Sequence, residues 1–574
     1  MKKQIFDAMK KVISKIFLII SITILFTACD NYLDPGYDEY LDKNEVFTSY
    51  TYSLNYIRTM YSYLPYDQWD EAVMSDEAKH CNDASAYTIM NNGSWDSRTY
   101  VQGWRWNHFY SGIRRVHVFL ENVDKAIFLD PNTYKLTPTV NDEMRIQLRA
   151  EARFLRAFYY FELLKRFGDP SLNLGVPIVP ERTLGITDTL DFKRNSYDEC
   201  VKYIVTDCDA AAAILPNRQS VVDYGKASKA AALALKSRLL LYAASPLANP
   251  SGDVAKWKLA IAAAKAVLAL PTYKLIDKTV ATSDNMLSIF TKPNNDEVLF
   301  SGPVTQTNSF EAANLPPGYS GGGQINPTQN LVDAFETIFG YPISDIPNSK
   351  YDATNPYYRR DKRLDYFVML NGTKLTAAAT ASVDSYVGGK DGLNSRQGAT
   401  KTGYYIRKFM DPTADIIINR TIATHFWVHF RYAETLLNYA EAVNAVYGPN
   451  VAPPDTTITA YTAYKKIRDR VGLITPSTVI NLSKDDFMQR IKNERRVELC
   501  FEGHRFWDVR RWNEGVKYFN APINGMKITK TPTATFTYEI FKVEDRVFEP
   551  KMNAMPIPYS EIQKSKLLQQ NIGW

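Results

Sequence analysis

The sequence KNERRVELCFEGHRFWDVRRW occupies residues 492–512 and is dense in both charged and aromatic side chains. Its first half predicts a helix that ends at Gly503, because glycine adopts the left-handed conformation that closes a helix without a Cβ penalty. A second, short helix should follow, because apolar residues recur every three positions at Phe506, Val509 and Trp512. The pattern predicts a helix pair whose acidic and basic side chains pair while its rings are buried.

Two carboxylates of the first helix, Glu494 and Glu498, have a scaffold and a catalytic interpretation. Glu–Arg pairs three or four residues apart stabilise a surface helix by about 0.2–0.5 kcal/mol each, which is a scaffold role. Catalysis would require both carboxylates to face one cleft, with a nucleophile or a tuned acid nearby, and the neighbouring sequence supplies neither. Asp76 and Glu77 are further acids, but a glycosidase pair needs a separation of about 5 Å or 6.5–9.5 Å that a sequence cannot establish.

The same stretch resembles the carboxyl-terminal signature of the SusD/RagB family of outer-membrane nutrient-binding lipoproteins. The matching residues are Glu494-Arg495, Glu498-Leu499, Glu502-Gly503-x-Arg505, Asp508 and Arg511-Trp512. Other segments that resemble the family are Trp106-x3-Tyr110-x2-Ile113, residues 152–160, Phe167-Gly168-Asp169-Pro170, Met555-Pro556-Ile557-Pro558, Glu561-Ile562 and residues 570–574. The resemblance therefore spans nearly the whole chain after its amino-terminal segment.

Apolar residues at helical spacing recur over much of the chain and predict a mainly α protein. Residues 141–167 carry two apolar stripes, which are typical of a helix buried between neighbours. Other predicted helices cover residues 45–63, 104–129, 197–215, 226–244, 254–270, 431–447 and 459–471. A clean period of about 34 residues is lacking, but the resemblance implies four tetratricopeptide-like helical hairpins packed against an irregular, loop-rich domain.

Composition changes along the chain predict its division into segments. These are a lipoprotein signal peptide at 1–28, a tether at 29–44, a helical scaffold at 45–270, an irregular loop-rich region at 271–423, and a C-terminal helical scaffold and tail at 424–574. A second irregular stretch, 65–102, is predicted to be a ligand loop inserted in the first scaffold. Long irregular segments within helical proteins are usually functional or disordered, and the regular Tyr, Phe and Ile in 271–423 indicate order.

The first 28 residues have the features of a secretory signal. A lysine-rich start precedes the apolar run IFLIISITILF, which is too short to span a bilayer, and small residues stand before Cys29. Cys29 resembles the cysteine of a bacterial lipobox, although Phe26 stands where leucine is commoner. Lipidation would anchor the protein firmly, because each buried acyl CH₂ contributes about 0.8 kcal/mol. The alternative is a plain signal peptide followed by a free cysteine.

The formal charge of the 574-residue chain is +6 and belongs mainly to this signal. Residues 1–28 contain five lysines and one aspartate, a net +4, so the remaining chain carries about +2. This balance argues against nucleic acid as a partner. The basic run at 359–363 is interrupted by Asp361 and is interpreted as a solvated patch or a set of ion pairs.

Motifs for metals, phosphates and disulfides are weak in this sequence. Cys200 and Cys208 lie on one predicted helix, about 12 Å apart along its axis, which is too far for a disulfide. His425 and His429 have helical ligand spacing but lack the glutamate of a zinc-protease motif, which favours packing over metal binding. The glycine run 321–323 lacks the Lys-Ser/Thr of a phosphate loop. We predict no cofactor or metal, and a structural calcium ion is not predicted.

The two irregular stretches hold the candidate ligand-binding residues. Sugars present apolar C–H faces, which aromatic rings cover, and hydroxyls, which Asp, Asn and Arg satisfy. In the family, ligand contacts come from loops in these two parts of the chain. The alternative for any loop tryptophan is packing onto the scaffold. The candidates are Trp69, Asn82, Asp83, Tyr87, Trp95 and Tyr319, and other side chains of these loops are Asp67, Asn91, Arg98, Phe310 and Gln324.

The resemblance implies a surface-exposed lipoprotein of the outer membrane, facing the exterior. It would bind a glycan or another nutrient oligomer and deliver it to a SusC-like TonB-dependent transporter. It would not be an enzyme, in keeping with the lack of a nucleophile–base motif. Two alternatives remain open: a secreted surface glycoside hydrolase, which would show turnover, and a helical protein-binding scaffold, which would lack an exposed aromatic platform.

Overall fold

The computed structural model describes residues 42–67, 69–129, 138–185, 187–276, 283–375, 381–414, 416 and 421–574. The predicted signal peptide, Cys29 and most of the tether lie outside these residues. Among the helices that the described residues form, none has the length and apolar character needed to cross a membrane.

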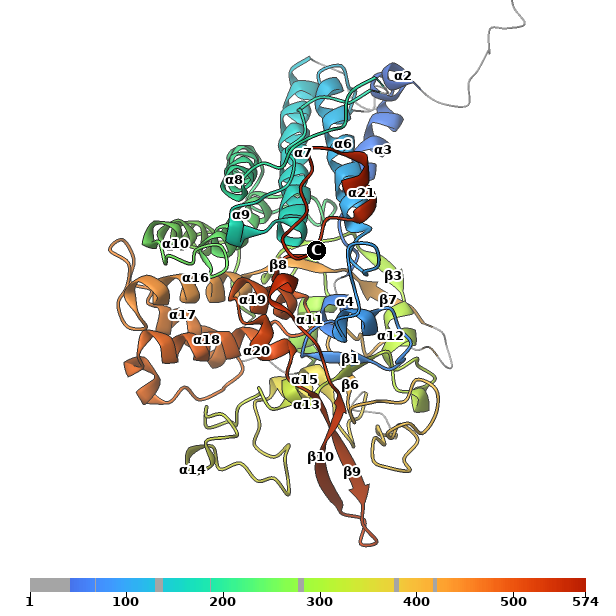
Figure 1. The fold of residues 1–574 in the computed structure, drawn as a ribbon, viewed down its shortest axis with the longest axis vertical. Coiled ribbons are helices and arrows are strands. Elements are labelled where there is room, and N and C mark those ends of the chain that lie inside the picture. Colours follow the sequence, from blue (N-terminus) through green and yellow to red (C-terminus); the bar gives the residue numbers. More distant parts are fainter. Residues whose placement is uncertain are drawn as a thin grey trace, which may run out of the picture.

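The architecture is mainly α-helical, as predicted, and its long helices pack against one another in sequence to form tetratricopeptide-like hairpins (Figure 1). The predicted range 45–63 divides into two helices at Ser49, whose backbone is extended, and the predicted range 104–129 ends as a helix at Asn122. The helices of the scaffold are α2 (Lys43–Thr48), α3 (Tyr50–Tyr61), α6 (Arg105–Asn122), α7 (Pro138–Phe167), α8 (Tyr197–Ile214), α9 (Lys229–Ala244), α10 (Val254–Leu268), α16 (Tyr432–Tyr447), α17 (Ala460–Arg470), α18 (Lys484–Glu498) and α19 (His504–Arg511).

Local sequence explains where several of these helices begin. Ser196 and Glu199 form a capping box at the start of α8, in which each side chain accepts from the other's backbone N–H. Ser228, Thr459 and Ser483 cap α9, α17 and α18 through their hydroxyl groups. Gly503 has the predicted left-handed backbone, φ +77°, but it directly precedes α19. The prediction that the first helix runs to Gly503 was wrong, because α18 ends at Glu498 with Leu499 as its C-cap.

The irregular parts form short helices and small sheets. Each sheet among the described residues is an antiparallel pair of strands. The pairs are β1 (Ala78–His80) with β4 (Ile325–Pro327), β2 (Val298–Ser301) with β8 (Val428–Arg431), β3 (Thr305–Thr307) with β7 (Ala423–His425), β5 (Val368–Met369) with β6 (Tyr405–Ile406), and β9 (Ile523–Lys530) with β10 (Phe536–Glu544). The short helices are α4 (Trp69–Val73), α5 (Tyr87–Asn91), α11 (Ser283–Thr291), α12 (Ser309–Asn314), α13 (Gln329–Val332), α14 (Ile346–Ser349), α15 (Arg363–Phe367), α20 (Gly515–Phe519) and α21 (Tyr559–Lys564).

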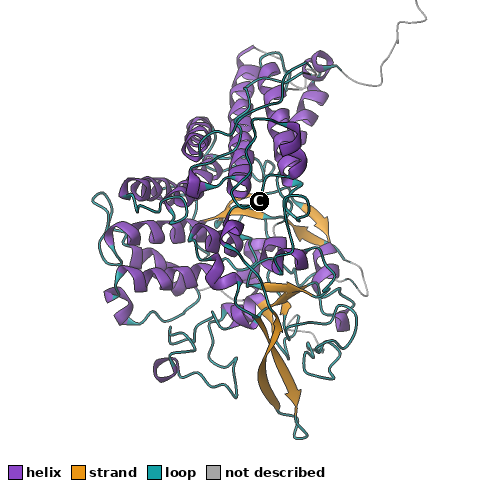
Figure 2. Ribbon diagram, viewed as in Figure 1, coloured by secondary structure: helices purple, strands orange, loops and turns teal. Residues whose placement is uncertain are grey.

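Figure 2 shows helices gathered at one end of the molecule and the strands among loops toward the other, where the β9–β10 ribbon projects. Buried apolar side chains form one cluster around α6–α9, a second within the irregular part and a third between α10 and α16–α18. The C-terminal tail returns to the first cluster through Met555 and Ile557, which are both fully buried. The C-terminal tail is therefore tied to the scaffold that holds the inserted loop.

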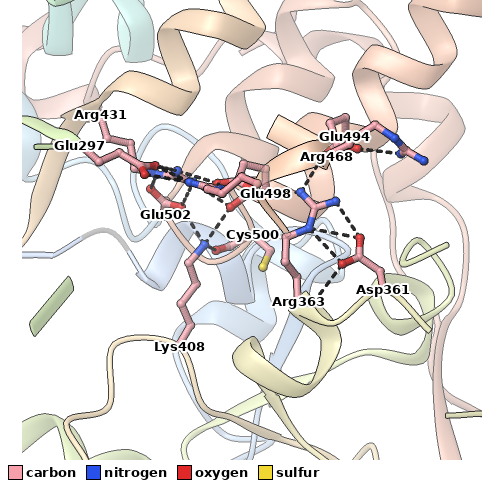
Figure 3. Close-up of polar contacts among 11 residues, drawn as sticks. Glu297, Asp361, Arg363, Lys408, Arg431, Arg468, Glu494, Glu498, Cys500 and Glu502 are labelled. Atoms are coloured by element: carbon pink, nitrogen blue, oxygen red, sulfur yellow. Dashed lines mark hydrogen bonds and ion pairs between the residues drawn. The ribbon is translucent and has the colours of Figure 1, made fainter. Parts of the chain in front are cut away.

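Buried ion pairs join the helical scaffold to the irregular part (Figure 3). Arg363 of α15 donates to Glu494 at 2.5 Å and to Glu498 at 2.9 Å. Both carboxylates are at most 2% exposed, so the expectation of surface pairs between neighbours on one helix was wrong: their partners come from distant segments. Burial alone would raise the pKa of Glu498, but the arginines around it outweigh this effect and hold its pKa well below the usual value.

Lys408 and Arg431 extend this network on the other side of Glu498. Both cations donate to the carboxylate of Glu502 at 2.7 Å, and Lys408 also donates to two backbone carbonyls of the α18–α19 connection. Arg431 further pairs with Glu297 at 2.9 Å, beside strand β2. Because the charges are buried and mutually paired, removing one partner would leave another charge without compensation.

The basic run at 359–363 takes part in the same network. Arg363 pairs with Asp361 at 2.7 Å, which confirms the ion-pair interpretation. Arg360 is also buried and donates to backbone carbonyls, whereas Arg359 and Lys362 are exposed. A solvated patch therefore describes only part of the run, because Arg360, Asp361 and Arg363 are buried.

Candidate ligand-binding site

Strand pairing brings the two irregular stretches together. Strand β1 of the 65–102 loop pairs with β4, which follows the glycine run, and Lys79 lies opposite Asn326. The pairing continues one residue further, where the Cys81 N–H donates to the Gln324 carbonyl at 2.9 Å. Two strands that the sequence separates by more than two hundred residues thus bring the two stretches together at one surface.

Three rings of the first stretch lie together at this surface. The Tyr87 ring, at the start of α5, lies 5.9 Å from the Trp69 ring of α4 and 5.8 Å from the His80 ring of β1, measured between centroids. All three side chains are half-buried, so each has one part in the protein and one part in solvent. The cluster has the character of an aromatic platform.

Charged groups lie beside the aromatic cluster. Burial raises the pKa of Asp67, although a hydrogen bond from Trp69 and the charge of Arg105 oppose the increase. Arg105, the first residue of α6, is 6% exposed and lies 3.9 Å from the Asp70 carboxylate. Burial, with the nearby charges of Asp70 and Asp67, raises the pKa of Tyr87 to about 12, so its hydroxyl stays protonated and can donate.

Asn82 and Asp83 follow β1 and are exposed, as a ligand-contacting role requires. The Asn82 side-chain oxygen accepts from the Ala84 N–H at 2.9 Å, which leaves its amide nitrogen available. Asp83 pairs with Lys79 at 2.9 Å and with Lys401 at 3.1 Å. Its limited burial would raise its pKa, but hydrogen bonds from these two lysines lower it.

Tyr319 lies in the second stretch, with its ring half-buried and its hydroxyl buried without a hydrogen-bond partner among the described residues. The Lys390 ammonium lies 4.6 Å from the ring centre. The adjacent glycines serve close packing: a Cβ on Gly323, whose φ is +54°, would lie 2.0 Å from the Gly398 carbonyl oxygen. Tyr319 therefore offers only part of a ring to a ligand.

The prediction that Trp95 contacts the ligand was wrong, because the side chain is buried. It is 5% exposed, and its ring lies 4.4 Å from the Trp574 ring and 6.0 Å from the Tyr100 ring. Packing against the end of the chain removes it from the surface that Trp69 shares. Contacts within the protein also hold Asn91, Arg98 and Phe310.

Trp104 was not among the predicted site residues, although it is 54% exposed. The Arg105 guanidinium lies 4.3 Å from the centre of its ring, and the Arg105 Nε is buried without a hydrogen-bond partner among the described residues. Arg105 thus connects an exposed indole to the Asp67–Tyr87 group. The sequence did indicate this exposure, because Trp104 lies outside the apolar stripe of α6 that contains Trp106.

A cavity of about 790 Å³ lies elsewhere, between α6, residues 177–185 and 190–192, and α21 with the residues that follow it. None of the predicted site residues lines it. The loop site is preferred over this cavity because the half-exposed ring cluster and its polar neighbours lie outside it. The candidate site is therefore defined by its side chains: Asp67, Trp69, His80, Asn82, Asp83, Tyr87, Trp104 and Arg105. Tyr319 stays a prediction, since the charged group against its ring is that of Lys390.

The described residues do not meet the requirements of a metal site. Among the residues that the structure describes, no cluster of three or more His, Cys, Asp or Glu could hold a metal ion, and the cysteines are free. His429 is buried against Phe300, 5.3 Å between rings, which confirms the packing interpretation. His425 instead approaches Glu311 at 3.1 Å.

Comparisons with known proteins cover nearly the whole chain. Residues 274–574 match the model of the SusD family, and residues 31–241 match a family described as starch-binding and associating with the outer membrane. The chain is 26% identical to SusD-like protein P38 of Formosa agariphila over 462 residues, which cover 76% of this chain and 77% of the relative.

Solved structures share the fold. A SusD-like protein from Bacteroides fragilis is 25% identical, with a TM-score of 0.76 over 94% of this chain and 99% of that one. A SusD-like carbohydrate-binding protein from the same species is 24% identical, with a TM-score of 0.72 over 91% of this chain and 100% of that one. The likeness therefore extends over both the helical and the irregular parts.

Proposed function

This chain belongs to the SusD family, and we propose that it captures a glycan, or another nutrient oligomer, at the outer membrane and passes it to a SusC-like TonB-dependent transporter. The matched family description, starch-binding and associating with the outer membrane, supports both the ligand class and the location. The carbohydrate-binding relative from Bacteroides fragilis, which has the same fold, supports the ligand class further.

The observation that carries the proposal is the half-exposed cluster of Trp69, Tyr87 and His80 beside carboxylate, amide and guanidinium groups. An aromatic face binds the C–H side of a pyranose, while the polar groups replace the water that its hydroxyls lose. Asn82 offers amide donors, and Asp67 offers a carboxylate acceptor. We include Trp104 as a second indole of the same platform.

We propose capture without hydrolysis. Glu494 and Glu498, the acids first considered for catalysis, are buried and bound by arginines. A glycosidase acid must reach the glycosidic oxygen, and its partner must reach the opposite face of the sugar. Carboxylates that are held in buried ion pairs have no such access.

We further propose that Cys29 is lipidated after removal of residues 1–28, so that the protein is anchored at the outer membrane and faces the exterior. The transporter would then be a membrane neighbour of the bound ligand. A lipid anchor and a tether allow the captured ligand to be delivered over a short distance without release into bulk solution.

Calorimetry on the chain from residue 29 onward tests this function. The panel would contain malto-oligosaccharides, laminari-oligosaccharides, other neutral and acidic glycans, and peptides, with product analysis on the same samples. We expect binding of at least one glycan, no turnover, and weaker binding by Trp69→Ala. Turnover of a bound glycan, or binding confined to peptides, would contradict the proposal.

A further inference from the structure

The segment 73–80 connects the two halves of the candidate site. It begins at the end of α4, which carries Trp69, and ends in β1, which carries His80. The distance and angle between the two rings therefore depend on the conformation of these few residues. Much of what holds this segment comes from the last fifth of the chain.

The Asp76 side chain is held by two arginines of the 492–512 stretch. Arg505 donates to its two oxygens at 2.8 and 3.0 Å, and Arg496 donates to one of them at 2.8 Å. Asp76 is 3% exposed and Arg505 is 4% exposed. Burial would raise the pKa of Asp76, but the charges of Arg496 and Arg505 outweigh it and keep the carboxylate ionised.

Backbone contacts fix the same segment from other sides. The Phe501 N–H donates to the Glu77 carboxyl oxygen Oε2 at 3.1 Å, and Phe501 takes the left-handed φ of +64° in doing so. Arg546 donates to the carbonyls of Ser75 and Ala78, on both sides of Asp76. The segment is thus held at its side chains and at its backbone.

We infer that Arg505, with Arg496, is a positioning residue for ligand binding: by holding Asp76 it sets the orientation of the segment that joins Trp69 to β1. This inference rests on the proposed function. The stretch that identifies the fold family would then act on the ligand site directly, besides joining scaffold helices.

A second arginine of the same helix provides a matched control. Arg511 is also 4% exposed and pairs with Glu441 of α16 and with Asp508 of its own helix. Its hydrogen bonds go to Asp508, Ser245 and Glu441, none of which lies in the segment 73–80. A change at Arg511 therefore disturbs the scaffold without loosening the connection between α4 and β1.

The test compares Arg505→Lys with Arg511→Lys. Lysine keeps the charge but loses the planar fork that binds both oxygens of a carboxylate. Affinity for the tightest-binding glycan of the panel, with maltoheptaose as the first probe, would be measured by calorimetry well below either unfolding temperature. Hydrogen exchange of the peptide covering residues 73–90 would be followed by mass spectrometry.

We expect Arg505→Lys to weaken binding by about tenfold and to speed exchange in residues 73–90. Arg511→Lys should change neither, although both variants lose stability. Asp76→Asn keeps the shape of the side chain but not its charge, and it should weaken binding and speed exchange as Arg505→Lys does. If Arg505→Lys fails to fold, Asp76→Asn is compared with Arg511→Lys instead. Equal effects of the two arginine variants, or unchanged binding and exchange in Arg505→Lys, would overturn the inference.

If the wild-type protein binds no glycan of the panel, the proposed function fails for that panel, and exchange alone decides whether Arg505 positions the segment. The two failures are therefore distinguishable. Faster exchange in Arg505→Lys but not in Arg511→Lys would support positioning, and equal exchange would refute it.

Discussion

The indole of Trp95 lies against the indole of Trp574, with 4.4 Å between the ring centres, so the inserted loop is fastened to the last residue of the chain. The Trp574 indole N–H donates to the backbone carbonyl of Ala554 at 2.9 Å, which fixes it from the other side. Two tryptophans of one loop therefore have different environments: Trp95 is buried and Trp69 is half-exposed.

Substituting these two tryptophans should separate binding from stability. Trp69→Ala removes part of the aromatic platform and should weaken glycan binding by about 1–2 kcal/mol, roughly five- to thirtyfold, with a smaller loss of stability. Trp95→Ala removes a buried ring and should lower the free energy of unfolding by about 3–5 kcal/mol. Calorimetry and urea unfolding measure the two quantities. Equal losses of affinity in two folded variants would contradict the assignment.

Trp104→Ala should also weaken binding, because this exposed indole lies beside Arg105 at the edge of the same group. We expect a loss of about 1 kcal/mol in affinity and less than about 0.5 kcal/mol in stability, as for an exposed side chain. Tyr52→Ala is a control, because Tyr52 is 42% exposed on α3, outside the candidate site. An effect of the same size in the control would remove Trp104 from the site.

Lys408→Met should be strongly destabilising. Lys408 is fully buried and donates to Glu502 and to two backbone carbonyls, so methionine would leave a buried carboxylate with one cation fewer. We expect a loss of about 3–5 kcal/mol in the free energy of unfolding. Lys527→Met, which breaks an exposed pair with Glu539, should cost less than about 1 kcal/mol. Similar losses in the two variants would show that the buried network adds little.

The carboxyl of Glu77 predicts a pH dependence. Burial raises its pKa from 4.5 to about 8; the hydrogen bond from Phe501 opposes this, and the charge of Asp76 adds to it. Between about pH 4.5 and 8 the folded chain keeps a proton on Glu77 that the unfolded chain releases. The free energy of unfolding of the wild type therefore falls as the pH rises through this range. Glu77→Gln cannot titrate and should gain stability relative to wild type through this window.

Urea unfolding at several pH values from about 5 to 9 measures this difference. We expect the advantage of Glu77→Gln to grow by up to about 4 kcal/mol and to level off above about pH 8. Groups that titrate alike in both proteins, including Asp76, cancel in the comparison. A constant difference across the range would mean that Glu77 titrates near its ordinary pKa.

Cys29→Ala should release the protein from membranes. Removal of the thiol removes the attachment point of the proposed acyl chains, which supply the binding energy of the anchor. Fractionation of cells that express the wild type and the variant measures the membrane-bound share. Persistence of the variant in the membrane fraction would count against the lipid anchor, and a Cys81→Ala control should leave the distribution unchanged.

Much of the fold could be predicted from the sequence because helix signals are local. The apolar stripes of α7, the serine before α8 and the glycine before α19 each act within one or two turns of their own position. The signature in residues 492–512 likewise identified the family before any contact was known. The grouping of Trp69, Tyr87 and Asn82 in one loop was also visible in the sequence.

The tertiary structure alone decided which ring faces solvent and which charge finds which partner. Trp69 and Trp95 occupy the same loop, and only contact with Trp574 distinguishes them. Nothing near Asp76 in the sequence specifies Arg505, since the two lie at opposite ends of the chain and meet through packing of α4 against α19. Burial and long-range pairing depend on the sum of many distant contacts, whereas helix periodicity depends on the chain itself.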